Sequence, residues 1–540
     1  MDTEAGVKVV RVCGKRGSSN FGRHGAFGNG LKCTKFILWK ENKDSMECLS
    51  SLTKVLKVPA KTFAFAGTKD KRGVTTQWVT AFRVHPNRLA GINNTAIGWR
   101  VGNFHYVADS LQLGQLLGNR FTVVLRKITA GGEDINRAVE SLKARGFINY
   151  FGMQRFGTSA DVMTHDIGCA MLKNDWPRIA DLLLLPRPGD HGPISRARTL
   201  YAETRSVSRT LAIMPMRCHI ERSFLGGLKD FGETQISTAF CRIPRLMRMM
   251  YLHAVQSLIW NRAVSRRLRE YGLKPVVGDL VFDQEKAKHV VHRHQSKNRG
   301  KSKAKEKPKP EGEDSTDQPD QPKISNETLT VLKEEDLSRF TIHDVVLPLP
   351  GMDIIFPEHK SHADYLEIMG ELGITLEEFD HKFVDFSLHG SYRKILCIPA
   401  DLTWEIIHHD DPIQPLSLTD LDLLDGKSME GSTTGRFKSL KLSFNLDTAS
   451  YATMALRELT RTDTSSGYYA SLTAGGGVEG EGEDEIGELE GEAGFLESFD
   501  DAETGEQRGA RDGELPENEE TTEPAAAHDE ASEAQQGQKS

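Results

Sequence analysis

The chain has 540 residues, of which 38% are hydrophobic and 27% charged, so it is long enough for two or three domains but too polar to fold throughout. Its formal net charge of -7 is unevenly spread. Residues 479–540 hold 22 Asp or Glu against three Lys or Arg, which leaves 66 Lys or Arg against 54 Asp or Glu in residues 1–478. Without an apolar run of about 18 residues or an apolar leader, membrane-spanning and secreted proteins are excluded, and we expect a soluble intracellular protein of the nucleus or the cytoplasm.

Two low-complexity stretches divide the chain. Residues 466–540 are rich in Glu, Gly and Ala and predict a disordered acidic tail, because they cannot bury enough apolar surface to offset chain entropy. Residues 286–321 predict a disordered loop, basic first and acidic after, with ten Lys or Arg between Lys286 and Lys309. This loop is either a solvated insertion or a segment for nuclear import or RNA tethering.

The seven cysteines include no C-x-x-C pair, so neither a disulfide framework nor a zinc knuckle is indicated. A Walker-type phosphate loop is also missing from the sequence. We therefore expect reduced, mostly buried thiols, no metal site and no cofactor.

Residues 44–82 predict a helix followed by a hairpin. Apolar residues recur at helical spacing over 46–56, after Asp44 and Ser45, which can cap a helix start, and Val58-Pro59 ends the helix. Residues 62–66 and 74–82 are rich in aromatic and β-branched residues and predict two strands. The turn between them reads GTKDKRG, so the hairpin carries a charged loop at its tip.

The elements that follow alternate irregularly. Residues 121–125 predict a strand, and an apolar stripe from Ile135 to Leu142, ended by Gly146, predicts a helix. Pro244 can open a long helix to about Tyr271. Its apolar side includes Leu246, and its other faces carry Arg248, Arg262, Arg266, Arg267 and Arg269. We expect an α+β architecture, since the Gly-rich strand-to-helix turns of a nucleotide-binding α/β sheet are missing.

Asp70 is the first candidate for chemistry. It lies among Lys69, Lys71 and Arg72, whose cations favour its ionised form. An ionised carboxylate can act as a base or a nucleophile at neutral pH, and the same cations attract a phosphate backbone. On composition alone, an ordinary charged turn is the simpler interpretation.

Residues 149–157, NYFGMQRFG, form the second candidate. The segment supplies aromatic faces for stacking, amides and an arginine that can read base edges, and glycines that allow close approach. A site that binds an unstacked base requires side chains of these kinds. An aromatic packing motif at a domain boundary explains the segment equally well.

Several long motifs occur together and in order: GTKDKRGVTTQW (67–78), LGNRFTVVLR (117–126), NYFGMQRFG (149–157), LPLPGMDIIFP (347–357) and SYATMALREL (450–459). Over roughly residues 30–465 this set resembles the TruD family of pseudouridine synthases. Within the family it resembles the eukaryotic pseudouridylate synthase 7 branch, as do KFILWKENKDSM (35–46) and GSYRKI (390–395).

The resemblance implies an RNA pseudouridine synthase, which breaks the N-glycosidic bond of a uridine in tRNA, and in some members other RNAs, and rejoins the base through carbon without a cofactor. The Asp of the family's G-x-K-D motif falls on Asp70, which is the expected catalytic residue. The residues expected to contact the substrate are Lys69, Asn149, Phe151, Gln154 and Arg155. On the helix over 244–271, Arg262, Arg266 and Arg269 are expected to contact the RNA backbone, and a merely solvated face explains these arginines nearly as well. We further expect Asn149 to hydrogen-bond Asp70 or the base, and Phe151 to stack on a flipped-out base.

The family's fold implies a discontinuous α+β catalytic domain, formed by residues 31–160 and 390–465 around a mixed, largely antiparallel sheet. Residues 161–389 would form an inserted α+β TRUD domain, with RNA in the cleft between the two. Residues 1–30 lack the family's usual PEDFxVxE segment, so we expect a divergent or incomplete N-terminus. The alternative to an enzyme is therefore a catalytically weak RNA-binding or RNA-folding protein with the same fold, and either would function as a monomer.

Overall fold

The computed structural model describes residues 30–157, 162–289, 324–429 and 434–462, together with the backbone of two short paired strands, β1 (Asp2–Glu4) and β2 (Val7–Val9). The predicted acidic tail, residues 466–540, lies outside the described residues. So does most of the predicted loop at 286–321, of which only residues 286–289 are described.

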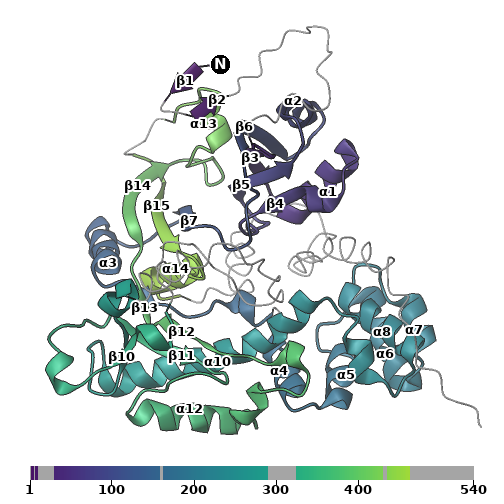
Figure 1. Ribbon diagram of the computed structural model, residues 1–540. Helices are drawn as coiled ribbons and strands as arrows, with labels where there is room; N and C mark the ends of the chain where they lie inside the picture. The colour runs from purple at the N-terminus through teal and green to yellow at the C-terminus, as the bar shows by residue number, and fades with distance from the viewer. Residues whose placement is uncertain are drawn as a thin grey trace, which may run out of the picture. The chain divides into compact units, whose positions relative to one another are not determined.

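The first sheet has the strand order β4-β5-β3-β6 and is antiparallel throughout (Figure 1). Its strands are β3 (Cys33–Glu41), β4 (Phe63–Phe65), β5 (Val74–Phe82) and β6 (Trp99–Val107). One face packs against α1 (Ser45–Leu56) and α2 (Pro86–Ala90), with Phe36 and Leu38 of β3 fully buried among helix residues such as Leu52. Alternation along β3 therefore leaves a second face that these helices do not cover.

A second sheet joins segments far apart in the sequence. Its order is β14 (Ala400–His409), β15 (Phe437–Asp447) and β7 (Gly118–Leu125), and β7 pairs with β15 over its whole length. Buried side chains of α3 (Gly132–Arg145) and α14 (Ala452–Thr460) share one core with these strands. Nearby, β8 (Phe147–Ile148) pairs with β13 (Leu396–Cys397).

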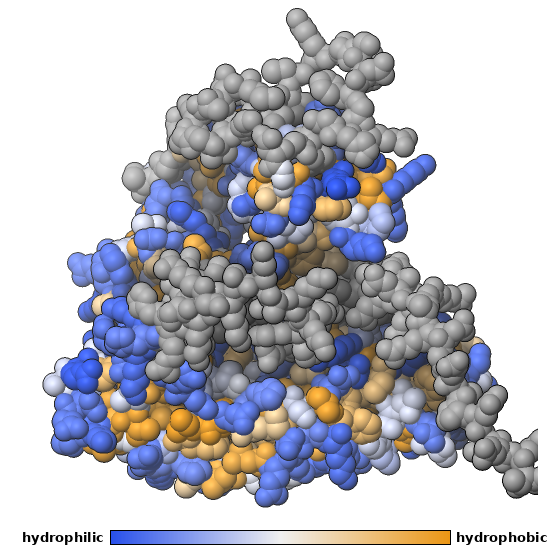
Figure 2. All heavy atoms as spheres, in the orientation of Figure 1, coloured by the Kyte–Doolittle hydropathy of each residue, from blue (hydrophilic) through white to orange (hydrophobic). Residues whose placement is uncertain are grey.

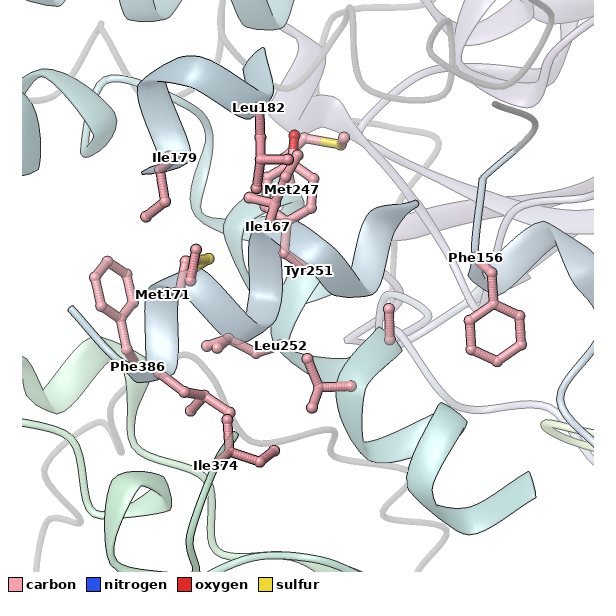
Figure 3. Close-up of a cluster of buried hydrophobic side chains, with 14 of the residues drawn as sticks. Phe156, Ile167, Met171, Ile179, Leu182, Met247, Tyr251, Leu252, Ile374 and Phe386 are labelled. Carbon is pink, nitrogen blue, oxygen red and sulfur yellow. The ribbon is translucent and has the colours of Figure 1, made fainter. Parts of the chain in front are cut away.

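Helices dominate residues 164–271. They are α4 (Thr164–Leu172), α5 (Trp176–Leu184), α6 (Gly192–Thr204), α7 (Val207–Ile213), α8 (His219–Phe231), α9 (Ile236–Phe240) and α10 (Arg245–Tyr271). Figure 3 shows Ile167 and Met171 of α4 in one cluster with Tyr251 and Leu252 of α10. The two helices approach closely at Gly168, where an added Cβ would lie 2.2 Å from the Tyr251 carbonyl oxygen.

The third sheet follows α10 and has the order β10-β9-β11-β12. Its strands are β9 (Leu280–Phe282), β10 (Leu329–Val331), β11 (Val345–Leu349) and β12 (Ser391–Lys394). Trp260 of α10 donates from Nε1 to the Leu347 carbonyl of β11. Two further helices are α12 (Lys360–Glu371), which packs on α10, and the short α13 (Asp420–Leu424).

The predicted elements and the α+β class are confirmed. Helix α1 begins after Asp44, whose carboxylate accepts from the Met46 amide, and Pro244 caps α10. Strands β4 and β5 form the predicted hairpin. All strand pairs of the described residues are antiparallel rather than mixed. The discontinuous domain boundaries stay a prediction.

The prediction for the faces of α10 was partly wrong. Arg248 and Arg267 were expected on the polar faces and are buried, while Leu246 of the expected apolar side is 45% exposed. Arg267 is buried because Asp279 compensates its charge: Nε and Nη2 donate to the two carboxylate oxygens at 3.0 and 2.6 Å. Sequence periodicity does not reveal such a partner, which lies beyond the end of the helix.

None of the described helices is long and apolar enough to cross a membrane.

Replacing Arg267 tests this buried ion pair. We expect Arg267→Ala to lower the free energy of unfolding by about 3–5 kcal/mol, because the Asp279 carboxylate stays buried without its cation. Urea unfolding measures the effect. Arg339→Ala, which removes an exposed partner of Asp336, is the control and should change stability by less than about 1 kcal/mol. Equal losses in the two variants would contradict this interpretation.

Candidate active site

The Asp70 loop, residues 67–73, joins β4 to β5 and is held by side chains of the surrounding sheet and helix. Gln77 of β5 donates from Nε2 to the Gly67 carbonyl at 3.0 Å, and Ser45 Oγ accepts from the Lys69 amide at 3.1 Å. Ser45 in turn donates to Gln77 Oε1 at 2.7 Å. The loop backbone is thereby fixed to the start of α1 and to β5, while the Asp70 side of the loop is exposed.

Lys40 anchors the same loop from inside the protein. It is 1% exposed, on the core face of β3, and its Nζ donates to the carbonyl oxygens of Lys69 at 3.1 Å and Asp70 at 2.5 Å. Burial lowers the pKa of Lys40, and nearby acidic groups, among them Asp44 and Asp70, partly oppose that shift. A buried cation thus binds the backbone of the residue whose carboxylate faces outward.

Lys69 connects the loop to the second sheet. Its ammonium donates to Asn119 Oδ1 at the start of β7. Burial lowers the pKa of Lys69, and the Asp70 carboxylate opposes this. Asn119 pairs with Leu446 near the end of β15, and α14 begins a few residues later at Ala452. The loop therefore contacts β7 beside the end of β15, the strand that precedes α14.

Asn149 lies in a buried hydrogen-bond network with Arg393 of β12. Arg393 donates from Nη2 to Asn149 Oδ1 at 2.7 Å and from Nε to its carbonyl at 2.8 Å, and Asn149 Nδ2 donates to the Lys394 carbonyl at 3.2 Å. Burial lowers the pKa of Arg393 to about 10. The predicted hydrogen bond between Asn149 and Asp70 is not among the contacts of the described residues.

Phe151 is 6% exposed and belongs to the hydrophobic core around α10. The Arg393 guanidinium lies 4.1 Å from its ring centroid, and Trp260 and Tyr451 pack edge to face against it at 5.8 and 6.2 Å. In this structure the ring is packed against these neighbours, and stacking of a flipped-out base on it stays a prediction. Its contact with Tyr451 brings it next to α14.

Gln154 and Arg155 lie on a 3-10 turn, Met153–Arg155, directly after Phe151. Gln154 is exposed, whereas Arg155 is half-buried with its guanidinium 5.6 Å from the Phe151 ring centroid. Arg155 Nε is buried and has no hydrogen-bond partner among the described residues. Gln154 is therefore open to solvent, and Arg155 has a buried N–H group without an acceptor among the described residues.

A pocket of about 540 Å³ lies between α10, α14 and the segment after β8. Its lining residues are Tyr150, Phe151, Met153, Phe156, Asn261, Arg262, Ser265, Arg266, Arg269, Met454 and Arg457. The pocket thus brings together four of the predicted site residues: Phe151, Arg262, Arg266 and Arg269. Its volume lies in the range of ligand-binding clefts.

The four arginines of the pocket differ in their partners. Arg262 pairs with Glu371, and Arg266 with Glu367 and Glu371 of α12. Arg269 and Arg457 have no ion pair within the described part of the chain. The pocket therefore has two guanidinium groups whose charge is not compensated by a carboxylate, which suits an anion such as a phosphate group.

Apart from the three arginines of α10, the predicted site residues fall into two groups. Lys69 and Asp70 lie on the loop of the first sheet, while Asn149, Phe151, Gln154 and Arg155 lie after β8. Among the contacts of the described residues, no hydrogen bond or ion pair joins Asp70 directly to the second group. The link is indirect, through Lys69, Asn119 and the paired strands β7 and β15, which lead to α14 and its contact with Phe151.

Sequence reasoning missed the residues that position the others. Lys40 gave a signal that sequence reasoning missed: it follows Phe36 and Leu38 at every second residue, on the core face of β3, where a lysine needs a polar partner. Arg393 and Arg457 lie inside two of the quoted motifs, GSYRKI and SYATMALREL. The partner of Arg393, Asn149, lies far away in the sequence, and Arg457 meets α10 only at the pocket, so only the structure assigns them a role.

Comparison with known proteins places these features in a family. The family model described as tRNA pseudouridine synthase D (TruD) matches residues 21–311 and 311–459. The chain belongs to the TruD family. The resemblance predicted from the motifs is thereby confirmed.

Two relatives in this family are similar over most of the chain. The human "Pseudouridylate synthase 7 homolog" is 39% identical over 462 residues, which are 85% of this chain and 63% of the relative. The "Multisubstrate pseudouridine synthase 7" of Schizosaccharomyces pombe is 40% identical over 439 residues, 80% of this chain and 62% of the relative. The chain thus spans less than two thirds of the length of these relatives.

A crystal structure of a TruD protein from Methanosarcina mazei has a similar fold. It matches with a TM-score of 0.56 and 24% sequence identity, over 80% of this chain and 89% of the other. The TruD-like α+β fold is therefore shown independently of the sequence motifs.

The role of Lys40 can be tested without an activity assay. We expect Lys40→Met to speed amide hydrogen exchange in residues 67–72 and to lower the free energy of unfolding by about 1–3 kcal/mol, because two carbonyls lose their charged donor. Hydrogen exchange followed by mass spectrometry measures the change. Lys43→Met, which removes an exposed partner of Glu47, is the matched control and should leave exchange in the loop unchanged.

Proposed function

We propose that this chain is an RNA pseudouridine synthase and that Asp70 is its catalytic carboxylate. The observation that carries the proposal is the Asp70 loop, whose backbone is fixed by Lys40, Ser45 and Gln77 while the residue itself is exposed. Membership of the TruD family supports the same reaction. An exposed acid on a rigid backbone can meet a reacting nucleoside without reorganising first.

The proposed reaction is an isomerisation. The bond between N1 of uracil and C1′ of the ribose breaks, a bond between C5 and C1′ forms, C5 loses its proton and N1 gains one. No atom or electron enters or leaves overall, so the chain's own residues suffice. Asp70 contacts the ribose or the base during these steps, which requires the target nucleotide to leave its stack.

The pocket beside α10 and α14 supports RNA as the substrate. Arg269 and Arg457 supply cations for the phosphate backbone, and Gln154 lies exposed nearby for contact with a base. Asn149 and Phe151 act from behind the surface, since Arg393 joins them into one packed unit. Lys69 belongs to the half of the site that carries Asp70, and Arg155 belongs to the half that carries Asn149 and Phe151.

We further propose a discontinuous catalytic domain, residues 31–160 and 390–465, with residues 161–389 as the inserted TRUD domain. The pairing of β7 with β15 and of β8 with β13 supports this division. RNA lies between the two parts, a single chain suffices as a monomer, and the substrates are tRNA and other RNAs of the nucleus or the cytoplasm.

Asp70→Asn tests the catalytic role. Removing the charge in an isosteric side chain should lower the rate of pseudouridine formation at least about 100-fold, because an amide can neither attack nor take a proton. Tritium release from transcribed tRNA labelled at C5 of uridine measures the reaction directly. Asp109→Asn, an exposed acid of the same sheet region, should retain the wild-type rate.

RNA binding by the Asp70→Asn variant should stay within about twofold of wild type. If the wild-type chain binds RNA and releases no tritium, the chain is an RNA-binding protein and not an enzyme. If Asp70→Asn retains full activity, the assignment of Asp70 is wrong.

The two arginines without acidic partners test the RNA contact. Arg269→Ala and Arg457→Ala should each weaken RNA binding. Each should also make the slope of log K against log salt less negative by about 0.7–0.9, the value of one lost phosphate contact. Fluorescence anisotropy across a salt series measures both quantities. Arg137→Ala removes an exposed arginine that pairs with Asp134 on α3 and should leave the slope unchanged. An unchanged slope in all three variants would exclude the pocket from RNA binding.

A further inference from the structure

The outer face of the β4-β5-β3-β6 sheet exposes aromatic rings rather than burying them. Its inner face carries Phe36, Leu38 and Val79, which are fully buried under α1 and α2. Alternation places Ile37 and its partner Trp78 on the other face. Trp78 is 36% exposed, and Phe82, four residues further along the same face, is 44% exposed.

Trp78 lies at the centre of a small aromatic and basic platform, which we define as Lys35, Trp78, Phe82, Arg83 and His105. The Lys35 ammonium lies 4.4 Å from the Trp78 ring centroid, and the His105 ring packs edge to face against Trp78 at 5.8 Å. At the end of the strand, the Arg83 guanidinium lies 5.3 Å from the Phe82 ring centroid. The platform thus crosses three strands, because Lys35 of β3 pairs with both Thr80 of β5 and His105 of β6.

The charges of the platform favour a polyanion. Lys35 has no ion pair with any carboxylate of the described residues, so its charge is available. The acidic residues nearest along the strands are Glu41 at the end of β3 and Asp109 beyond the end of β6, and both lie past the platform. Figure 2 shows hydrophobic and hydrophilic residues intermixed on the surface turned toward the viewer.

Strand β5 joins the platform to the Asp70 loop and sets the distance between them. Trp78 lies four residues along β5 from Val74, where the strand begins directly after the Asp70 loop. At about 3.4 Å per residue this separation is about 14 Å, which a stacked strand spans in about four nucleotides. The segment after β6 crosses this face between Trp78 and Phe82, since the Leu111 amide donates to Thr80 Oγ1 at 3.1 Å and Thr80 is 1% exposed, and it continues to β7 and Asn119.

We propose that this platform binds a single-stranded stretch of RNA that flanks the nucleotide held at Asp70, with Trp78 stacking on a base and Lys35 contacting the adjoining phosphate. The proposal rests on the proposed function, since it extends the substrate site beyond the cleft. Antiparallel sheets with exposed aromatic residues on one face and helices on the other are a recurring way to bind single-stranded RNA. Stacking on an aromatic ring tolerates any base, so the platform adds affinity and length preference rather than sequence preference.

The test compares short and long RNA on the full chain. Short oligonucleotides carry the target uridine with two neighbours on each side, and long ones are extended by eight nucleotides on the 5′ or the 3′ side. For the wild-type chain we expect extension on one side to raise affinity by about 5- to 100-fold, the range that one stacked base contributes. Fluorescence anisotropy measures the dissociation constants.

Trp78→Ala should abolish most of the affinity gained on extension. Its affinity for the short oligonucleotide, and its rate of tritium release at saturating RNA, should stay within about twofold of wild type. Trp78→Phe should retain most of the gain, because a phenyl ring still stacks. Lys35→Glu should reduce the affinity gain. It should also lower the magnitude of the slope of log K against log salt for the long RNA by about 0.7. Phe231→Ala is the control, because Phe231, at the end of α8, is a ring of comparable exposure, 45% against 36% for Trp78, and the Arg242 guanidinium lies 5.6 Å from its centroid.

A cross-linking measurement covers the case in which Trp78→Ala does not fold. With 4-thiouridine in the extension, the wild-type chain should give a cross-linked peptide from β3, β5 or β6. A gain that persists in Trp78→Ala, or cross-links confined to other elements, would overturn the proposal. Failure of the proposed function is distinguishable, because it appears as absent tritium release from the wild-type chain with the binding gain intact.

Discussion

The candidate site depends on one buried cation. Lys40 places an ammonium group under the loop that carries Asp70 and binds the carbonyls of Lys69 and Asp70. Burying a charge is costly unless it is hydrogen-bonded and compensated, and here carbonyl oxygens and nearby carboxylates supply both. The hydrogen bonds to the backbone hold the loop in one conformation, so its acidic side chain is presented to solvent at the same place in every molecule.

A second cation organises the other half of the site. Arg393 contacts Asn149 through both its side chain and its carbonyl, and it lies over the Phe151 ring. Its cost of burial is visible in the lowered pKa of its guanidinium, about 10. The two halves use the same physical arrangement, in which a buried positive charge fixes a backbone segment and leaves the surface free for the substrate.

Much of the fold could be predicted from the sequence because its signals are local. The cap at Asp44, the proline before α10 and the β-branched run of β5 each act within a few residues. The family could be predicted because several long motifs occur in order. Partners distant in the chain could not be predicted: Arg267 with Asp279, Arg393 with Asn149, and β7 with β15. Periodicity therefore assigned Arg248 and Arg267 to solvent, although both are buried.

The pairing of β7 with β15 has a consequence for how the chain is made. Thr122 and Ser443, which face each other across these strands, are 321 residues apart in the sequence. At a synthesis rate of about 5–20 residues per second, β7 leaves the ribosome roughly 16–64 seconds before its partner exists. During that time its backbone groups and apolar side chains lack their final neighbour, and such an unpaired edge invites association with other nascent chains. The pairing that joins two distant segments of the chain thus leaves the edge of β7 unprotected during translation.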